Sequence, residues 1–402
     1  MKSLLTVFID GLKPESIEHM PFLNSFRSKR RVRTELGYSP TCYASMFSGV
    51  HPNKHLHWFT WQYSPGTSPY KWISRFKIDK LPHNIFTQYA CYKITSTLGG
   101  VAIPWEGVMG LTWWYIPVQG WSYLDIAIKK HWSEPNFIEN YPSLFDILVA
   151  NRVPYEIVGL EAPTLEESSR TIDQHNFSEI KNWTFFFIGD IDPLSHRYEQ
   201  DSPQAIDRLK EIDRILERKY ELFEKADKDF LFMLFSDHGH IKVKNRLNLR
   251  AFFDSQGESL GNYIYFIDES YARFWFRNEV ERNRVTKVLS RIGDKGFILT
   301  EEHMQKYKVD MPDNRYGDLI FYLDVPYAFH HGAVVLGRRI EGKPSVSAHG
   351  YLPDHADSDG VLISNKELRD FPYVELVDIM PSVLDVFGIE MPDYVDGKAI
   401  WR

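Results

Sequence analysis

The hydrophobic pattern of this chain contains runs with the length and character of buried strands. Three runs are apolar almost throughout, which is typical of strands covered by helices on both faces of a parallel sheet. They span residues 4–9, 183–188 and 230–235. Apolar residues then recur at near-helical spacing from Ile206 to Phe223, after Ser202 and Pro203, two residues favoured at a helix start. We therefore expect an α/β fold with a mostly parallel sheet.

Weaker patterns indicate the remaining organisation. A helix is expected at residues 143–151 and a strand at 155–159; another strand is expected at 360–363, before a helix at 374–387. Between them, shorter strands at 264–266 and 272–276 precede a charged helix at 280–291. We expect a core of residues 1–245 and 346–402, carrying an aromatic-rich insertion at about 58–140, and a smaller inserted α+β lobe at 246–345.

Acidic residues follow each of the three long apolar runs. Asp10 ends the first run, Asp190 and Asp192 follow the second, and Asp237 follows the third. Ligands of open α/β sheets lie beyond the carboxyl ends of the strands, so these side chains should meet at one edge of the sheet. Carboxylates gathered in this way repel one another unless cations hold them.

Composition and charge exclude several classes of protein. The 402 residues are 43% hydrophobic and 25% charged, which is ordinary for a globular protein with a large core. A net charge of −7 argues against binding of a nucleic-acid duplex, which needs a basic face. The one basic run, residues 27–33, is expected at the exposed end of an early helix. The sequence does not indicate an oligomeric state.

Cysteine content and apolar segments bear on the compartment. Two cysteines, Cys42 and Cys91, are too few for a disulfide framework or a cysteine-based zinc site. The apolar run at the N-terminus is too short for a signal peptide, and we find no transmembrane segment of 18 apolar residues. We expect a cytoplasmic protein.

A short segment near the N-terminus carries both start and stop signals for a helix. Ser39 is favoured as an N-cap, Pro40 at the first helical position, and Gly49 at the end. A helix N-terminus offers free N–H groups and a positive dipole end, which suit a phosphoryl or sulfuryl oxygen as well as a cap. Taken alone, the segment indicates only a capped helix.

Two acid–histidine pairs follow the second and third apolar runs. Asp192 and His196 are four residues apart, and Asp237 and His238 are adjacent. Carboxylate and imidazole are good ligands for zinc and manganese, and a site without thiolates would be catalytic rather than structural. Each pair alone more often serves to orient a side chain, but three acid-ended strands together favour a metal site.

Several motifs occur along the chain in a fixed order. They are Phe-Ile-Asp-Gly at 8–11, Tyr-Ser-Pro-Thr-Cys-Tyr-Ala-Ser-Met-Phe-Ser-Gly at 38–49, Asp-Pro-Leu-Ser-His at 192–196, Ser-Asp-His-Gly-His at 236–240, Arg-Tyr-Gly-Asp-Leu-Ile at 315–320 and Ala-His-Gly-Tyr at 348–351. Together they resemble the alkaline phosphatase superfamily, specifically its type I phosphodiesterase and nucleotide pyrophosphatase branch. The resemblance implies a three-layer, doubly wound sheet with an inserted smaller lobe.

The resemblance also implies a two-metal site with a nucleophile. The metals would be two divalent ions, zinc or alternatively manganese. Asp192, His196 and His349 would hold one ion, and Asp10, Asp237, His238 and the nucleophile Ser39 would hold the other. Ser39 would attack phosphorus in line and form a covalent phosphoseryl enzyme. We expect a phosphodiesterase acting on a small-molecule phosphate ester. A phosphomonoesterase or phosphotransferase of the superfamily, and a catalytically silent binding module, are the alternatives.

The nucleophile segment departs from the branch, which usually has Thr where Ser39 stands. Thr41 is a rival, but Ser39 lies ten residues before Gly49, as the nucleophile of the family does, and Thr41 would lie inside the helix. A sulfatase is not expected, because its motif needs Pro or Ala two residues on and Arg four residues on, where this chain has Thr41 and Tyr43.

Other residues keep open interpretations. Asp190 is an alternative to Asp192, although the four-residue spacing to His196 favours Asp192. His240 and His355 are spare ligand candidates. We expect His51, His55 and His57 mainly in turns and in packing. Lys54 or His55 is a candidate to face substrate oxygens. The aromatic stretch from Tyr70 to Trp121 is expected to be lobe core, with stacking on a base or sugar, or binding of a lipid-like tail, as the alternatives.

Overall fold

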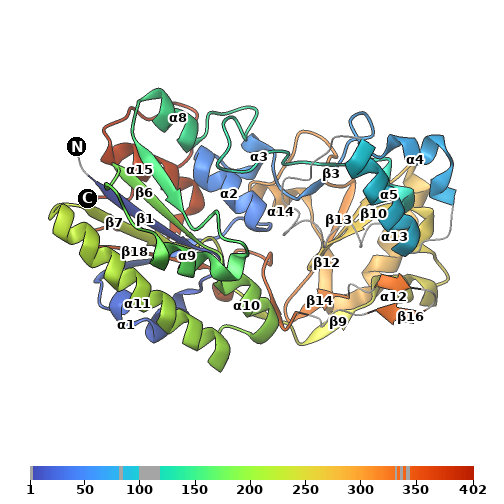
Figure 1. Cartoon of the computed structure of the whole chain (residues 1–402). Coiled ribbons are helices and arrows are strands. Elements are labelled where there is room, and N and C mark those ends of the chain that lie inside the picture. The colour runs from blue at the N-terminus through green and yellow to red at the C-terminus, as the bar shows by residue number, and fades with distance from the viewer. Residues whose placement is uncertain (1–2, 81–84, 99–117, 331–332, 336–337, 341–344) are drawn as a thin grey trace. The chain divides into compact units, whose positions relative to one another are not determined.

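The computed structural model describes residues 3–80, 85–98, 118–330, 333–335, 338–340 and 345–402 (Figure 1). The chain forms two compact units, each built from separate stretches of sequence. The first unit contains residues 1–55, 132–242 and 345–402, and the second contains residues 56–131 and 243–344.

The first unit contains the long strands predicted from the apolar runs. Its strands are β1 (Leu4–Ile9), β2 (Ser28–Arg33), β5 (Tyr155–Val158), β6 (Trp183–Ile188), β7 (Leu231–Phe235), β8 (Ile241–Lys242), β17 (Ser347–Ala348), β18 (Gly360–Ser364) and β19 (Val374–Glu375). Its α-helices are α1 (Pro21–Asn24), α2 (Ser39–Ser48), α3 (Pro52–His55), α8 (Leu144–Ala150), α9 (Ser168–Gln174), α10 (Ile191–Tyr198), α11 (Pro203–Ala226) and α15 (Ile379–Val386). Short 3₁₀ helices are η1 (Pro14–His19), η4 (Leu165–Glu167), η7 (Ala356–Ser358) and η8 (Leu376–Asp378).

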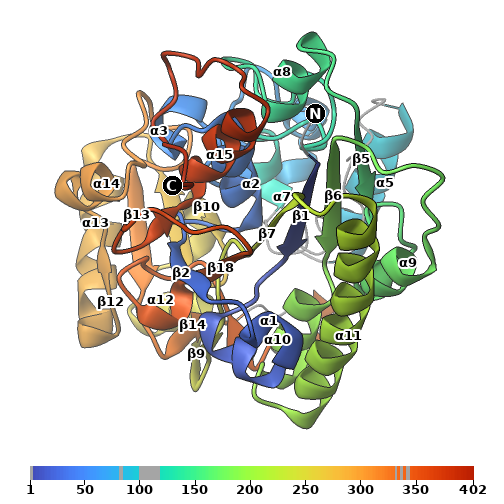
Figure 2. The same ribbon diagram turned by 90° about the vertical axis from the view of Figure 1, so that its left-hand side faces the viewer.

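Seven of these strands form one sheet in the order β19-β2-β18-β7-β1-β6-β5. β7, β1, β6 and β5 are parallel to one another, and β18 is antiparallel to both of its neighbours. Helices α2, α8 and α15 lie on one face of the sheet, and α1, α9 and α11 lie on the other (Figures 1 and 2). This three-layer, mostly parallel arrangement confirms the predicted α/β fold.

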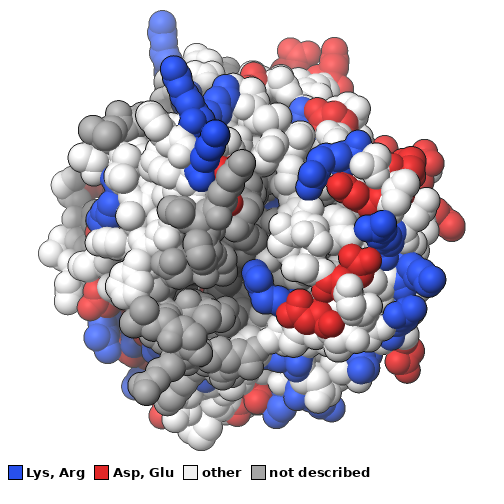
Figure 3. All heavy atoms as spheres, turned by 90° about the vertical axis from the view of Figure 1, so that its right-hand side faces the viewer, with Lys and Arg blue, Asp and Glu red and all other residues white. Residues whose placement is uncertain are grey.

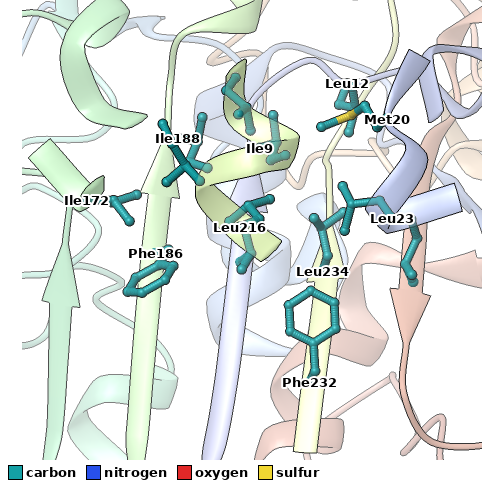
Figure 4. Close-up of a cluster of buried hydrophobic side chains, with 14 of the residues drawn as sticks. Ile9, Leu12, Met20, Leu23, Ile172, Phe186, Ile188, Leu216, Phe232 and Leu234 are labelled. Carbon is teal, nitrogen blue, oxygen red and sulfur yellow. The ribbon is translucent and has the colours of Figure 1, made fainter. Parts of the chain in front are cut away.

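A continuous core fixes the parallel strands beneath α11. Leu216 of α11 packs in one cluster with Phe186 of β6 and Leu234 of β7, all of them buried (Figure 4). Burial of each such side chain contributes about 1.5–3 kcal/mol, so the strand ends are held firmly in place. The amphipathic pattern of α11 places its apolar face in this cluster, and Ser202 caps the helix as predicted, accepting a hydrogen bond from Ala205 N.

The second unit is built around a four-stranded antiparallel sheet in the order β10-β11-β13-β12. Its strands are β3 (Trp61–Tyr63), β4 (Leu124–Ile126), β9 (Asn245–Leu247), β10 (Ile264–Ile267), β11 (Tyr271–Trp275), β12 (Gly296–Ile298), β13 (Leu319–Leu323), β14 (Tyr327–Phe329), β15 (Ala333–Val335) and β16 (Arg338–Ile340). Its helices are α4 (Lys71–Arg75), η2 (Ile78–Lys80), α5 (Ile85–Leu98), α7 (Val118–Trp121), α12 (Leu249–Ser255), η5 (Leu260–Asn262), α13 (Glu279–Leu289), η6 (Ser290–Lys295) and α14 (Glu301–Lys306).

The aromatic insertion expected to belong to the core groups instead with this second unit. Trp61, Tyr70 and Trp121 share a buried cluster with Phe266 of β10 and Trp275 of β11, so these three side chains pack within the second unit. These described aromatic residues are lobe core. Tyr63 and Tyr123 line a cavity of about 290 Å³ in the same unit. Residues 81–84 and 99–117 of the stretch considered for stacking or lipid binding lie outside the described residues.

Two secondary-structure predictions were wrong. Residues 28–33 form strand β2 rather than the end of a helix, because their side chains find partners that a local pattern does not show: Val32 is buried, and Arg31 Nε donates to Asp359 Oδ2 at 2.8 Å. The helix expected at 374–387 is shorter, since β19 and η8 precede α15.

Charged residues of both signs lie side by side on the right-hand half of the face in Figure 3. Across the described ranges, no helix combines the length and the apolar character needed to cross a membrane.

Candidate active site

The candidate site lies in the first unit, where three neighbouring parallel strands end. β7, β1 and β6 are adjacent in the sheet. Asp10 directly follows β1, and its N–H still pairs with Ile188 O of β6 at 2.8 Å. Asp237 follows β7, and Asp192 lies in the first turn of α10, after β6. The topology thus gathers the three carboxylates that the sequence indicated.

One group of ligand-type atoms surrounds His238. Its Nε2 lies 3.5 Å from Asp10 Oδ1 and 3.5 Å from Asp237 Oδ2. Both carboxylate oxygens are buried and have no hydrogen-bond partner within the described residues. Ser39 Oγ lies 3.1 Å from the same Nε2. Unpaired buried carboxylate oxygens are costly unless a cation or proton compensates them.

A second group surrounds Asp192. Its Oδ1 lies 3.4 Å from His196 Nε2 and 3.5 Å from His349 Nε2. The two groups adjoin, because the His349 ring stacks on the His238 ring with centroids 3.8 Å apart and planes inclined by 7°. The structure therefore brings together all seven residues predicted for the site.

These residues fit divalent cations. Zinc bonds of about 2.0–2.1 Å in a tetrahedral site place two ligand atoms about 3.3 Å apart, close to the 3.4–3.5 Å separations found here. His196 and His238 each direct Nδ1 at a backbone carbonyl, Ser347 O at 2.9 Å and Gly239 O at 3.1 Å. A proton on Nδ1 leaves Nε2 with a lone pair, the form that binds metal.

The electrostatics of the cluster also favour cations. Burial, reinforced by Asp237 and Asp192, raises the pKa of Asp10 well above its usual range. Burial raises the pKa of Asp237 to about 8. Burial alone would raise the pKa of Asp192 too, but His196, His240 and His349 hold it well below the usual range. Two of three clustered acids therefore resist ionisation, a cost that a bound divalent cation removes.

Helix α2 carries Ser39, but Ser39 is not its cap. The N-cap is Tyr38 in extended conformation, with Ser39 and Pro40 at the first two helical positions. Tyr38 O accepts hydrogen bonds from Thr41 N and Cys42 N, so fewer N–H groups are free at this helix start than expected. The partly exposed Ser39 hydroxyl is consequently available to face His238 instead of closing the helix.

Of the spare candidates, His240 lies within the cluster and shares a third potential metal-binding group with Asp192 and His238. The other alternative candidates lie elsewhere. The buried carboxylate of Asp190 accepts from Ser168 Oγ and Ser169 Oγ at 2.5 Å each, so it serves this pair rather than the cluster. Thr41 is fully buried in α2. Among the residues that the structure describes, His355 joins none of the potential metal-binding groups and precedes η7.

The histidines expected in turns and packing contact side chains outside the candidate site or are buried. His51 pairs with Glu35 at 3.2 Å, and His55 Nε2 lies 3.0 Å from Ser45 Oγ. His57 is buried in the second unit. Lys54, considered for substrate oxygens, pairs with Asp396.

The sequence analysis did not predict the roles of two supporting residues. The Tyr43 hydroxyl donates to Asp10 Oδ2 at 2.7 Å. Tyr43 lies four residues after Ser39 on the same helix face, and this spacing could have indicated a role at the site. Gln200 Oε1 accepts from Lys13 N at 3.2 Å, and its side-chain amide donates to Gly11 O, fixing the turn after β1. No sequence pattern indicates this second role.

The family model described as type I phosphodiesterase / nucleotide pyrophosphatase matches residues 90–352, more than half of the chain. No curated protein gives a significant match. Solved structures with a similar fold include human ectonucleotide pyrophosphatase/phosphodiesterase 5, at 12% identity and a TM-score of 0.65, covering 99% of this chain and 97% of that chain. An inactive Thr-to-Ala variant of the murine protein, in complex with AMP, matches at 11% identity and a TM-score of 0.65, covering 98% of this chain and 96% of that chain.

Proposed function

Because the chain belongs to the type I phosphodiesterase / nucleotide pyrophosphatase family, we propose that it is a phosphodiesterase of small-molecule phosphate esters with Ser39 as nucleophile. The observation that carries this proposal is the position of Ser39. Ser39 is partly exposed at the start of α2, and its hydroxyl lies 3.1 Å from His238 Nε2, beside clustered carboxylate and imidazole side chains. Thr41, the rival nucleophile, is buried.

The proposal includes two divalent metal ions, zinc or alternatively manganese. Asp192, His196 and His349 would hold one, and Asp10, Asp237, His238 and Ser39 would hold the other. Bound there, such ions lower the pKa of a hydroxyl nucleophile and neutralise charge on phosphate oxygens. The unpaired oxygens of Asp10 and Asp237 support this assignment.

The protein's own groups would carry the chemistry in two displacements. Ser39 Oγ forms a bond to phosphorus while the bond from phosphorus to the leaving alcohol breaks, which gives a phosphoseryl enzyme. Water then adds to phosphorus, releases a phosphate monoester and restores the Ser39 hydroxyl. The positive dipole end of α2 favours the phosphoryl group at this place. Tyr43 and Gln200 hold the Asp10–Gly11 turn in position throughout.

Nucleotide esters are the first substrates to test, because the murine relative is described in complex with AMP. The assay compares hydrolysis of a bis-aryl phosphate, a mono-aryl phosphate and a nucleotide diester. Preference for the diesters is expected. Preference for the monoester would indicate the phosphomonoesterase alternative, and absence of both metal and turnover would indicate a binding module.

Three variants test the nucleophile. Ser39→Ala should lose about three orders of magnitude or more in kcat, as expected for a missing nucleophile. Ser39→Thr should retain measurable turnover, because it keeps a hydroxyl at the same position. Thr41→Ala is the matched control two residues away and should stay within about tenfold of wild type. Wild-type turnover in Ser39→Ala, with loss in Thr41→Ala, would show that the assignment is wrong.

A further inference from the structure

A fourth histidine, His240, lies among the three histidines assigned to the metals. Its side chain is 1% exposed, and its ring centroid is 4.8 Å from that of His196 and 5.3 Å from that of His349. Its Nε2 lies 2.9 Å from Asp192 Oδ1. This position allows two roles: a further metal ligand, or a side chain that orients Asp192.

The distances to Asp192 Oδ1 separate His240 from the other histidines. His196 and His349 approach this oxygen at 3.4 and 3.5 Å, the spacing of two atoms that bind one cation. His240 approaches it at 2.9 Å, the usual length of an N–H···O hydrogen bond. With zinc bonds of about 2.0–2.1 Å, a separation of 2.9 Å would narrow the angle at a shared ion to about 90°, well below the tetrahedral angle.

The second ring nitrogen of His240 differs as well. His196 and His238 place Nδ1 against backbone carbonyls, which fixes the proton there and frees Nε2 for a metal. His240 Nδ1 instead lies 3.3 Å from Ser347 Oγ, whose own hydroxyl donates to a backbone carbonyl at 2.6 Å, so both ring nitrogens of His240 face hydrogen-bond acceptors. A neutral imidazole has one N–H, and a short hydrogen bond to a charged carboxylate is stronger than a long one to a hydroxyl, so the 2.9 Å contact with Asp192 assigns the proton to Nε2.

The turn after β1 is shaped around this pair. Gly11 has φ +71°, and a Cβ there would lie 3.0 Å from His240 Nε2 and 3.3 Å from Asp192 Cβ. The glycine thus lets the backbone pass directly over the hydrogen bond. Its own N–H donates to Asp237 Oδ1 at 3.2 Å, which links this turn to the other group of ligands.

We propose that His240 is a positioning residue that donates Nε2–H to Asp192 Oδ1 and thereby sets the orientation of this carboxylate. The oxygen has a second lone pair, which stays available to a cation held with His196 and His349. The proposal rests on the proposed function in one respect, that Asp192 is a metal ligand. Loss of such an orienting partner typically lowers metal affinity by about 10- to 100-fold.

The test compares two substitutions at one position. Metal-free protein is titrated with zinc against a chromophoric chelator for wild type, His240→Ala, His240→Gln and the control His19→Ala, whose side chain lies beside Glu18. Gln can donate an amide N–H where His240 donates Nε2–H. We expect about 10- to 100-fold weaker binding of one zinc equivalent in His240→Ala, recovery to within about threefold of wild type in His240→Gln, and no change in the control.

Equal loss in both His240 variants would overturn the proposal and make His240 a ligand, and wild-type affinity in His240→Ala would also overturn it. ¹⁵N NMR of histidine-labelled wild-type protein provides a readout that does not depend on folding of the variants. The His240 ring should carry its proton on Nε2 with and without zinc, and a bare Nε2 would contradict the proposal. Failure of wild type to bind zinc would refute the proposed metal site instead, while the NMR result still decides the hydrogen bond.

Discussion

Replacing Tyr43 by Phe should weaken metal binding while leaving the fold intact. The Tyr43 hydroxyl donates to Asp10 Oδ2 at 2.7 Å, which leaves Oδ1 as the oxygen without a partner among the described residues. A buried hydrogen bond to a charged group contributes about 1.5–3 kcal/mol. If that energy is lost from the oriented carboxylate, zinc affinity falls by about 10- to 150-fold, at 1.4 kcal/mol for each factor of ten.

The assay is titration of the metal-free protein with zinc against a chelating dye. Tyr394→Phe is a matched control, because it removes a hydroxyl that donates to Pro142 O at 3.1 Å, outside the ligand groups. The aromatic ring of Tyr43, which contacts Phe8 with centroids 5.7 Å apart, is retained, so thermal unfolding of the metal-free protein should stay cooperative, with a Tm lowered by the loss of one buried hydrogen bond. Wild-type zinc affinity in Tyr43→Phe would refute the argument that this hydroxyl orients Asp10.

Two further predictions concern stability. Ser143→Ala removes the capping box of α8, in which Ser143 Oγ accepts from Asp146 N and Asp146 accepts from Ser143 N. The free energy of unfolding should fall by about 1 kcal/mol, measured as a lower urea midpoint with an unchanged m-value. Burial alone would lower the pKa of His51, but the hydrogen bond and charge of Glu35 raise it above 6.5. The stabilisation by this pair should therefore be complete below about pH 6.5 and disappear as the pH rises through the native pKa. The difference in Tm between wild type and His51→Gln should accordingly shrink between about pH 6 and pH 9.

The sequence predicted the part of the fold that depends on buried parallel strands. β1, β6 and β7 are covered on both faces, so their apolar runs are visible without knowledge of any partner. The position of Asp10 and Asp237 at the strand ends then followed from topology alone. The choice of Asp192 over Asp190 rested on its spacing to His196, and the structure places these two side chains together.

Features that depend on distant partners were not predicted. β2 is rich in arginine and lysine, and it is a strand because β18 and β19 pair with it. The grouping of residues 56–131 with the second unit depends on contacts such as that of Tyr63 N with Arg315 O at 2.6 Å. The role proposed for His240 likewise resides in a single hydrogen bond, which leaves no periodic trace in the sequence.

The place of β18 in the sheet has a consequence for the order of folding. β1, β6 and β7 can pair as soon as residue 235 has been synthesised, but β2 joins these strands through β18, and β19 pairs with the other side of β2. Arg31 and its partner Asp359 are 328 residues apart, so the early strand waits for almost the whole chain. His349 arrives in the same final segment. Sheet completion and assembly of the candidate metal site therefore both wait for residues 345–402, and until these are synthesised the edge of β7 that pairs with β18 stays open to other strands.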